Sequence, residues 1–246
     1  MNKPFKTYNG GKAGNGTYQK IINHIPKCDV FVDAMVGNGG IFLNLNLPQI
    51  TVINDIDTSV IDKYNKVLID KHNYEGHNKN IIVENIDYRS LIDKYDDVRS
   101  KVCFYFDPPY LMETRKSNKK LYTFDWELKH HENFLLRAVT VKSNVIISHY
   151  PCDLYDKYLN GWYMHDFQSM TRNGLRTERI YMNYPKPYIL QDYRYLGSDY
   201  RDRQRIKRKI NRFISKLDGL PTEERTGILS AVIAKYDDTA VKLLRK

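Results

Sequence analysis

The sequence predicts an α/β fold: an open, mostly parallel sheet with an antiparallel edge hairpin and a C-terminal basic helical extension. Three observations predict it. Five short apolar runs alternate with segments of helical composition, as expected for parallel strands joined by crossover helices. Two further strand-like runs follow one another closely and can pair antiparallel at the sheet edge. Beyond residue 192 the chain becomes strongly basic and takes on helical spacing.

The expected strands are short runs rich in Val, Ile, Phe and Tyr, which fit a pleated and buried surface. Several of them are continuously apolar, which is typical of strands covered on both faces. The strands are expected at residues 28–36, 50–56, 80–87, 102–109 and 143–150, and the edge hairpin at 161–170 and 179–185. The helices between the strands are expected at residues 57–72, 88–97 and 128–141.

Two domains are expected, a sheet domain over residues 1–192 and a basic helical extension over residues 193–246. In the segment 200–216 the apolar residues recur on one helical stripe, and Lys and Arg dominate the remaining positions. A second helix is expected after Pro221, because proline suits the start of a helix. The extension therefore reads as a helical hairpin, whose basic face is either simply solvated or in contact with phosphates.

The composition describes a folded protein with a preference for polyanions. The chain has 246 residues, 41% of them hydrophobic, and a formal net charge of +10. A basic balance of this size favours a nucleic-acid partner, since phosphate neutralisation dominates nucleic-acid affinity. We expect a cytoplasmic protein without a membrane partner, because no apolar run is long enough to span a bilayer and the start lacks a secretory signal. The widely spaced Cys28, Cys103 and Cys152 are expected to be buried, reduced thiols.

A glycine-rich turn follows the first expected strand, in the stretch "FVDAMVGNGGIF" at residues 31–42. Gly37, Gly39 and Gly40 permit a tight turn and the close approach of a ligand to backbone N–H groups. We expect this turn to open a helix. Its spacing is not the dinucleotide-binding fingerprint, so a pyrophosphate ligand is not favoured.

Acidic residues recur at the ends of successive expected strands. Asp55 ends the second strand, where a carboxylate can accept hydrogen bonds from the ribose hydroxyls of an adenosine-containing cofactor. Asp87 ends the third strand, where it could accept from an adenine amino group. Each acid could instead cap a helix. Their recurrence favours a ligand site, because ligands of open parallel sheets bind at the carboxyl ends of the strands.

The fourth expected strand runs into the stretch "DPPY" at residues 107–110. Two prolines in series fix the direction of the chain, so the Asp107 carboxylate and the Pro108 carbonyl can face one way as two acceptors. An exocyclic amine on a nucleic-acid base offers two donors that match them. Tyr110 offers an aromatic face on which a flipped base can stack. Such a pocket would prepare the amine to attack an electrophilic methyl group by positioning and electrostatics alone.

Taken together, these motifs resemble the DNA N6-adenine methyltransferases of the Dam-like and phage-encoded kind, over roughly residues 5–190. The resemblance implies a Rossmann-like methyltransferase sheet, S-adenosylmethionine as cofactor, DNA as partner and no metal. It assigns the catalytic role to Asp107, Pro108, Pro109 and Tyr110. It assigns cofactor binding to Tyr8 and Lys12 of the leading stretch "YNGGKAG", and to Asp33, Gly37, Gly39, Asp55 and Asp87.

One departure from that family concerns the reading of DNA. Dam-like enzymes usually carry a target-recognition segment before the catalytic motif, but here Asp87 and Asp107 leave room for only a helix and a linker. We expect the basic, aromatic segment 112–126 to take over part of this role, with help from the segment around residues 172–176 and from the C-terminal helix. The nucleic-acid contacts expected there are Arg115, Lys119, Lys120, Tyr122, Arg172, Arg176, Arg205 and Lys209.

Several alternatives stay open at the level of sequence. N4-cytosine methylation of DNA needs nearly the same acceptor geometry, and N6-adenine methylation of RNA needs a different shape only outside the pocket. A non-catalytic nucleic-acid-binding protein on the same fold is the rival of another class. His130, His131 and His149 are given no catalytic role, and no cluster suggests a metal. The target sequence, the oligomeric state and the biological role, whether restriction–modification, phage defence or regulation, are not encoded in these motifs.

Overall fold

The structure is a computed structural model, and it describes residues 11–236 except residues 13, 15, 70–79, 98, 116–123 and 172–173. Its centre is a seven-stranded sheet in the order β3-β2-β1-β4-β5-β7-β6. The strands are β1 Val30–Asp33, β2 Ile50–Asn54, β3 Asn80–Glu84, β4 Val102–Phe106, β5 Asn144–His149, β6 Tyr163–Thr171 and β7 Gly174–Met182.

The direction of the strands confirms the predicted sheet. Strands β1 to β5 are parallel to their neighbours, while β7 lies antiparallel between β5 and β6. The order reverses between β1 and β4, the adjacent central strands, from which the chain proceeds outward in opposite directions. This is a Rossmann-like sheet, and such sheets bind ligands outside the carboxyl ends of the strands at the point of reversal.

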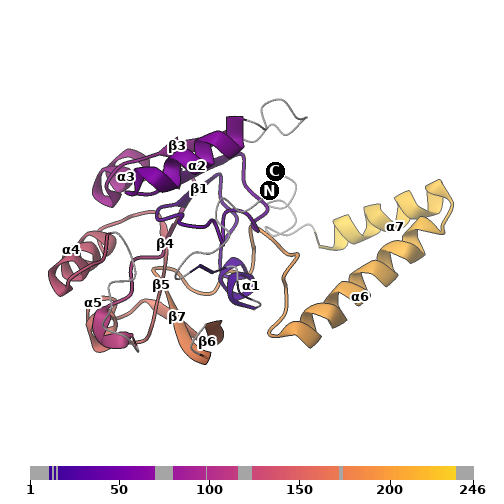
Figure 1. Cartoon of the computed structure of the whole chain (residues 1–246). Helices are drawn as coiled ribbons and strands as arrows, with labels where there is room; N and C mark the ends of the chain where they lie inside the picture. Colours follow the sequence, from indigo (N-terminus) through magenta and orange to yellow (C-terminus); the bar gives the residue numbers. More distant parts are fainter. Residues whose placement is uncertain are drawn as a thin grey trace.

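Helices cover both faces of the sheet, as predicted (Figure 1). They comprise α1 Thr17–Ile22, α2 Thr58–Ile69, α3 Tyr88–Tyr95, the short 3-10 helix η1 Met112–Thr114, α4 Leu128–Ala138 and α5 Asp153–Tyr158. One core packs Phe104 and Phe106 of β4 against α3, α4 and α5. A second core packs Cys103 and Tyr105 from the opposite face of the same strand against α1. Every residue of β4 is buried, which explains its continuous apolar run.

Local details differ from the sequence prediction at three places. The glycine-rich turn does not open a helix: residues 34–45 form successive turns, because Gly37 and Gly39 adopt left-handed backbone with φ of 46° and 67°. Strand β7 begins at Gly174 rather than at residue 179, since pairing with β6 continues into a polar stretch that shows no apolar alternation. Helices α1 and α5 are single short helices that the composition did not single out.

The extension contains α6 Tyr200–Asp218 and α7 Thr222–Lys235, and Figure 1 shows α6 leading away from the sheet body and α7 running back alongside α6. Asp199 caps α6 by accepting a hydrogen bond from the Asp202 N–H at 2.8 Å. Neither helix contains a buried residue. The link to the body packs as far as Tyr195, whose carbonyl accepts from Asn23 Nδ2 at 2.6 Å. No helix within the described residues is long and apolar enough to cross a membrane.

Candidate functional site

A cavity of about 430 Å³ opens at the carboxyl ends of the central strands. It lies where the strand order reverses, the position expected for a ligand of such a sheet. Among the residues predicted from sequence, those that line it are Lys12, Asp33, Gly37, Asp55, Asp87, Asp107 and Pro109. The fold therefore gathers residues from five separate stretches of sequence around one space.

The glycine-rich turn is held in place by the acid at the end of β2. Asp55 is buried and accepts hydrogen bonds from the backbone N–H groups of Gly37 and Asp57, both at 3.0 Å. Tyr64 donates to the Gly37 carbonyl at 3.2 Å from the other side. At Gly39 a Cβ atom would collide with the Tyr64 hydroxyl and the backbone is left-handed, so only glycine fits there. The turn is thus a rigid wall of the cavity.

Asp33, at the end of β1, carries a buried oxygen that accepts no hydrogen bond from the described residues. Its side chain is 2% exposed and one oxygen accepts from the Phe42 N–H at 3.3 Å. The Oδ1 atom has no hydrogen-bond partner among the described residues. Burial, reinforced by the neighbouring charge of Asp107, raises the pKa of Asp33 to about 8. A ligand cation beside Asp33 would offset this cost, so the site suits an ammonium or sulfonium group.

Asp87 caps a helix and also lines the cavity. Its side chain caps α3 by accepting from the Arg89 N–H at 2.9 Å, and it also pairs with the Arg89 side chain at 2.8 Å. It nevertheless lines the cavity, as Arg89 does. The helix-cap role is therefore present in the structure, and a contact to the adenine of a cofactor stays a prediction.

The catalytic candidate Asp107 is anchored through one oxygen. Its Oδ1 atom accepts from Lys12 Nζ at 2.6 Å and from Ser148 Oγ at 2.8 Å. The Ser148 hydroxyl lies 2.9 Å from that of Tyr105, which continues the network into the core. Burial raises the pKa of Asp107, although Lys12 acts against this. Since both of these contacts fall on Oδ1, Oδ2 is placed to accept from a ligand in the cavity.

Glu178, a buried acid of β7 at the same site, is not among the residues predicted from the sequence. The Tyr110 hydroxyl donates to Glu178 Oε1, and Lys12 Nζ lies 3.1 Å from that oxygen. Lys12 is therefore shared between Glu178 and Asp107. A usable signal was the alternation of Glu178 with Ile180 and Met182, which places the acid on the buried face of the strand.

Tyr110 differs from its expected placement. It is only 8% exposed and does not line the cavity. Lys12 Nζ lies 4.6 Å from the centre of its ring, and Tyr150 packs edge-on at 4.5 Å. A base can stack on Tyr110 only after Lys12 shifts, because the lysine now covers that ring. Pro108 is also buried, whereas Pro109 is half-buried and forms part of the cavity wall.

The predicted nucleic-acid contacts are distributed unevenly. Arg115 is a correction: it is buried, because its guanidinium binds both oxygens of Asp125 and also donates to the Tyr110 carbonyl at 2.6 Å. Arg176 lies 5.6 Å from the ring centre of Tyr150. Arg205 and Lys209 are exposed on α6, where Arg205 also pairs with an acid of its own helix. Lys119, Lys120, Tyr122 and Arg172, together with the cofactor candidate Tyr8, lie outside the described residues.

The histidines near the site have structural partners. His149 is buried; its Nε2 accepts from the Leu111 N–H at 2.9 Å and its Nδ1 faces the Tyr150 carbonyl at 2.7 Å. Burial lowers its pKa to about 3, so it is neutral at ordinary pH and fastens the segment after "DPPY" to β5. His131 Nδ1 lies 2.9 Å from the Tyr155 hydroxyl. Within the described residues no group of His, Cys, Asp and Glu is arranged to hold a metal ion.

Comparisons with known proteins add little at the level of family. The sequence matches no protein-family profile and no curated protein. Among solved structures, the chain is similar to an rRNA methylase from Streptococcus thermophilus, with 18% identity, a TM-score of 0.40, and coverage of 67% of this chain and 93% of that one. It is also similar to magnesium protoporphyrin IX methyltransferase from Synechocystis, solved with bound S-adenosylmethionine, with 12% identity, a TM-score of 0.42, and coverage of 67% and 74%. Scores this low establish neither a family nor an activity.

Proposed function

We propose that this chain is an S-adenosylmethionine-dependent methyltransferase that methylates the N6 amino group of adenine in DNA after base flipping. The observation that carries the proposal is the position of Asp107, which faces the same cavity as the acids at the ends of β1 and β2. A methyl donor and a methyl acceptor must meet within van der Waals contact. One cavity meets this need if the acids at the ends of β1 and β2 hold the cofactor and Asp107 accepts hydrogen bonds from the amine of the base.

The charge of the cavity supports a cationic cofactor. Asp33, Asp55 and Asp107 line the cavity. Among the described residues, Lys12 is the buried cation that lines it with them. The Asp33 oxygen without a partner among the described residues suits the amino group of S-adenosylmethionine, and Asp55, directly after β2, would accept from the ribose hydroxyls. When bound, this cofactor would supply an electrophilic methyl group on a positively charged sulfur.

The acceptor side is built to orient an amine. Lys12 and Ser148 pin Asp107 through Oδ1, so Oδ2 keeps a fixed direction toward the cavity. An amine donating to Oδ2 and to the Pro108 carbonyl would hold its nitrogen lone pair toward the cofactor. The proton lost from that nitrogen can pass to water after the transfer. The lysine contact to Glu178 gives Lys12 an alternative partner when a base enters.

Support for DNA as the substrate comes from the basic extension. Arg205, Lys209, Arg212 and Lys216 recur every three or four residues, so they follow one side of α6. Charges in a row of this kind can contact several phosphates of a nucleic-acid strand. The proposal for DNA rather than RNA rests on the motif resemblance.

The decisive experiment incubates the protein with labelled S-adenosylmethionine and unmethylated genomic DNA, or total RNA, and digests the product to nucleosides. We expect N6-methyl-2′-deoxyadenosine from DNA; N4-methyl-2′-deoxycytidine from DNA, or label in RNA alone, would assign one of the alternatives. Asp107→Ala should reduce turnover at least 1,000-fold, as expected when a transition-state contact is lost, while cofactor binding by calorimetry stays within about threefold. The exposed Asp62→Ala serves as the matched control, and cofactor binding without transfer to any nucleic acid would refute the proposal.

A further inference from the structure

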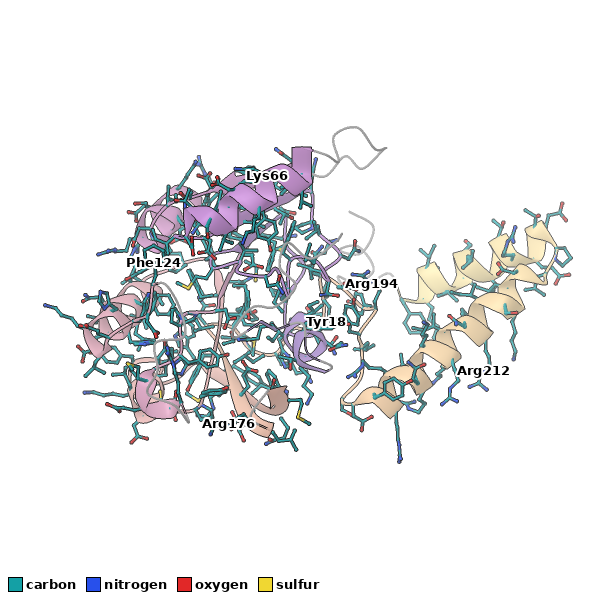
Figure 2. All side chains as sticks on the ribbon, in the orientation of Figure 1. Tyr18, Lys66, Phe124, Arg176, Arg194 and Arg212 are labelled. Carbon is teal, nitrogen blue, oxygen red and sulfur yellow. The ribbon has the colours of Figure 1, made fainter. Side chains whose placement is uncertain are left out.

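A second cavity, of about 620 Å³, lies where the sheet body meets the start of α6. The body contributes Lys20 of α1 and Gln168 of β6, and the extension contributes Arg203 and Lys207 of α6. Figure 2 shows Tyr18 and Arg194 at this junction and Arg212 on the outward part of α6. The cavity therefore joins two parts of the chain that otherwise touch little.

The walls of this cavity carry four cations and one acid. Of its cations, Arg194 pairs with Asp192 at 2.6 Å. None of Lys20, Arg203 and Lys207 forms a salt bridge with an acid of the described chain. The one acid in the wall, Asp199, is engaged in capping α6. Like charges held together in this way repel one another unless an anion lies between them.

A buried donor at this junction lacks a partner. Arg203 Nη1 is buried and has no hydrogen-bond partner among the described residues. A buried donor of a charged group without an acceptor is costly, which makes a merely solvated basic face a poor explanation. Burial, and then the charge of Arg203, lower the pKa of Lys20. The missing component has the properties of an oxyanion, several acceptors and negative charge.

The cavity faces the same edge of the sheet as the candidate active site. Strand β6 runs in the direction of β5, since both are antiparallel to β7. His149, the last residue of β5, pairs with Arg179 of β7, which in turn pairs with Asp166 of β6. Gln168 follows Asp166 on β6 and therefore lies beyond the carboxyl end of β5. The segment from Lys12 to Lys20 therefore links Asp107 to the second cavity, and Thr17 fastens it to Ser169 at 2.7 Å.

We propose that this second cavity binds a backbone phosphate of the nucleic-acid substrate, with Lys20 from the body and Arg203 and Lys207 from α6 as its ligands. The substrate identity rests on the proposed function, whereas the site itself rests on the buried donor and the three cations. A phosphate bound here would tie the extension to the body, and would orient α6 when the substrate is engaged. The same chemistry would accept free phosphate, so the test must separate the two sources.

The test measures duplex DNA affinity by fluorescence anisotropy across a salt series, with the full-length protein. Arg203→Gln and Lys20→Gln should each weaken binding roughly tenfold, about one charged hydrogen bond, and reduce the slope of log affinity against log salt by about one. The exposed Arg201→Gln on the same helix removes an equal charge outside the cavity and should weaken binding less than about threefold.

A shared phosphate makes a specific prediction for the double variant. Lys20→Gln combined with Arg203→Gln should lose much less than the product of the two single losses, because both residues act on one ligand. Arg203→Lys, which keeps the charge, should recover part of the affinity. Equal effects of Arg203→Gln and Arg201→Gln, or fully multiplicative losses, would overturn the proposal.

Free phosphate and substrate phosphate are separated by a second arm. Thermal unfolding is followed during titration with sodium phosphate against sodium chloride at equal ionic strength. Stabilisation that depends on Arg203, without any Arg203 effect on duplex binding, would assign the site to small anions and overturn the nucleic-acid assignment. Because binding is measured without methyl transfer, failure of the proposed reaction leaves this test intact. Normal methylation with no special effect at Arg203 would reject this site alone.

Discussion

Helix α4 of the sheet body and helix α6 of the extension are similarly amphipathic but are buried very differently. In α4, Phe134 and Leu135 are fully buried against the sheet. In α6, Phe213 and Ile214 occupy an equally regular apolar stripe, yet they remain 55% and 50% exposed. An apolar stripe in sequence therefore predicts a helix face, and only the neighbouring elements decide whether that face is covered. The body holds its reacting groups rigidly, while the extension presents charge.

The largest change in the free energy of unfolding is expected for a substitution in the core of the sheet body, and its absence would contradict the comparison. Phe134→Ala removes a buried ring that packs edge-on against Phe106 of β4 and Tyr88 of α3. We expect the free energy of unfolding to fall by about 3–5 kcal/mol, the usual cost of deleting a buried aromatic ring. Urea denaturation followed by tryptophan fluorescence measures it. A loss below about 1 kcal/mol would mean that the sheet and α4 are not tightly packed.

Asp33→Asn should sharpen the comparison by showing a body residue held for binding rather than for stability. The folded pKa of about 8 lies above the ordinary value of 3.8, so the folded state holds this proton more firmly than the unfolded state. The resulting stabilisation is complete below pH 4 and is lost as the pH rises toward 8. At pH 8 the free energy of unfolding of the variant should therefore exceed that of the ligand-free wild type by about 1–3 kcal/mol. Near pH 4 the two values should be equal.

The same substitution should weaken S-adenosylmethionine binding at least tenfold, since it removes the charge proposed to face the cofactor's amino group. Urea titrations at pH 4, 6 and 8, with calorimetry of cofactor binding, measure both effects. The exposed Asp62→Asn is the control. If the variant gains no stability relative to the wild type as the pH rises, Asp33 ionises freely in the cavity.

Glu178→Gln addresses the residue that sequence alone did not reveal. Glutamine keeps an acceptor for the Tyr110 hydroxyl but removes the charge beside Lys12. We expect turnover to fall roughly tenfold with little change in the KM for cofactor, because Lys12 and Tyr110 would be less well oriented. Steady-state kinetics with the exposed Glu113→Gln as control give the comparison. A parallel loss of thermal stability would instead assign Glu178 to packing.

The smallest effect is expected in the extension. Phe213→Ala should change the free energy of unfolding of the body by no more than about 0.5 kcal/mol, because the ring is more than half exposed. The measurement is the same urea titration used for Phe134→Ala. A loss of several kcal/mol would reveal that the apolar face of α6 is covered in solution, for example by a second copy of the chain, and the oligomeric state would then be measured by light scattering.

Most of the sheet could be predicted because apolar periodicity reports burial directly. Strands β1 to β5 and helices α2, α3 and α4 follow from it, and the motifs placed Asp33, Asp55 and Asp107 at strand ends that meet at one cavity. The resemblance to a known family added Lys12, whose segment shows no apolar pattern of its own.

What the sequence could not predict depends on contacts between distant residues. Arg115 looked like a DNA contact because it begins a basic segment, but Asp125 across the loop neutralises it. Glu178 lies 68 residues from Tyr110 in sequence and reaches it only through the sheet order β5-β7-β6. The anion-binding cavity likewise needs α1 and α6 together, and neither helix signals it alone.

The absence of buried residues in α6 and α7 has a consequence for motion. Opening a turn of either helix exposes little new apolar surface, so their amide protons should exchange with solvent far faster than those of β4, which are protected by the whole sheet. The extension can then bend at small energetic cost, without disturbing the geometry of the cavity at the carboxyl ends of the strands.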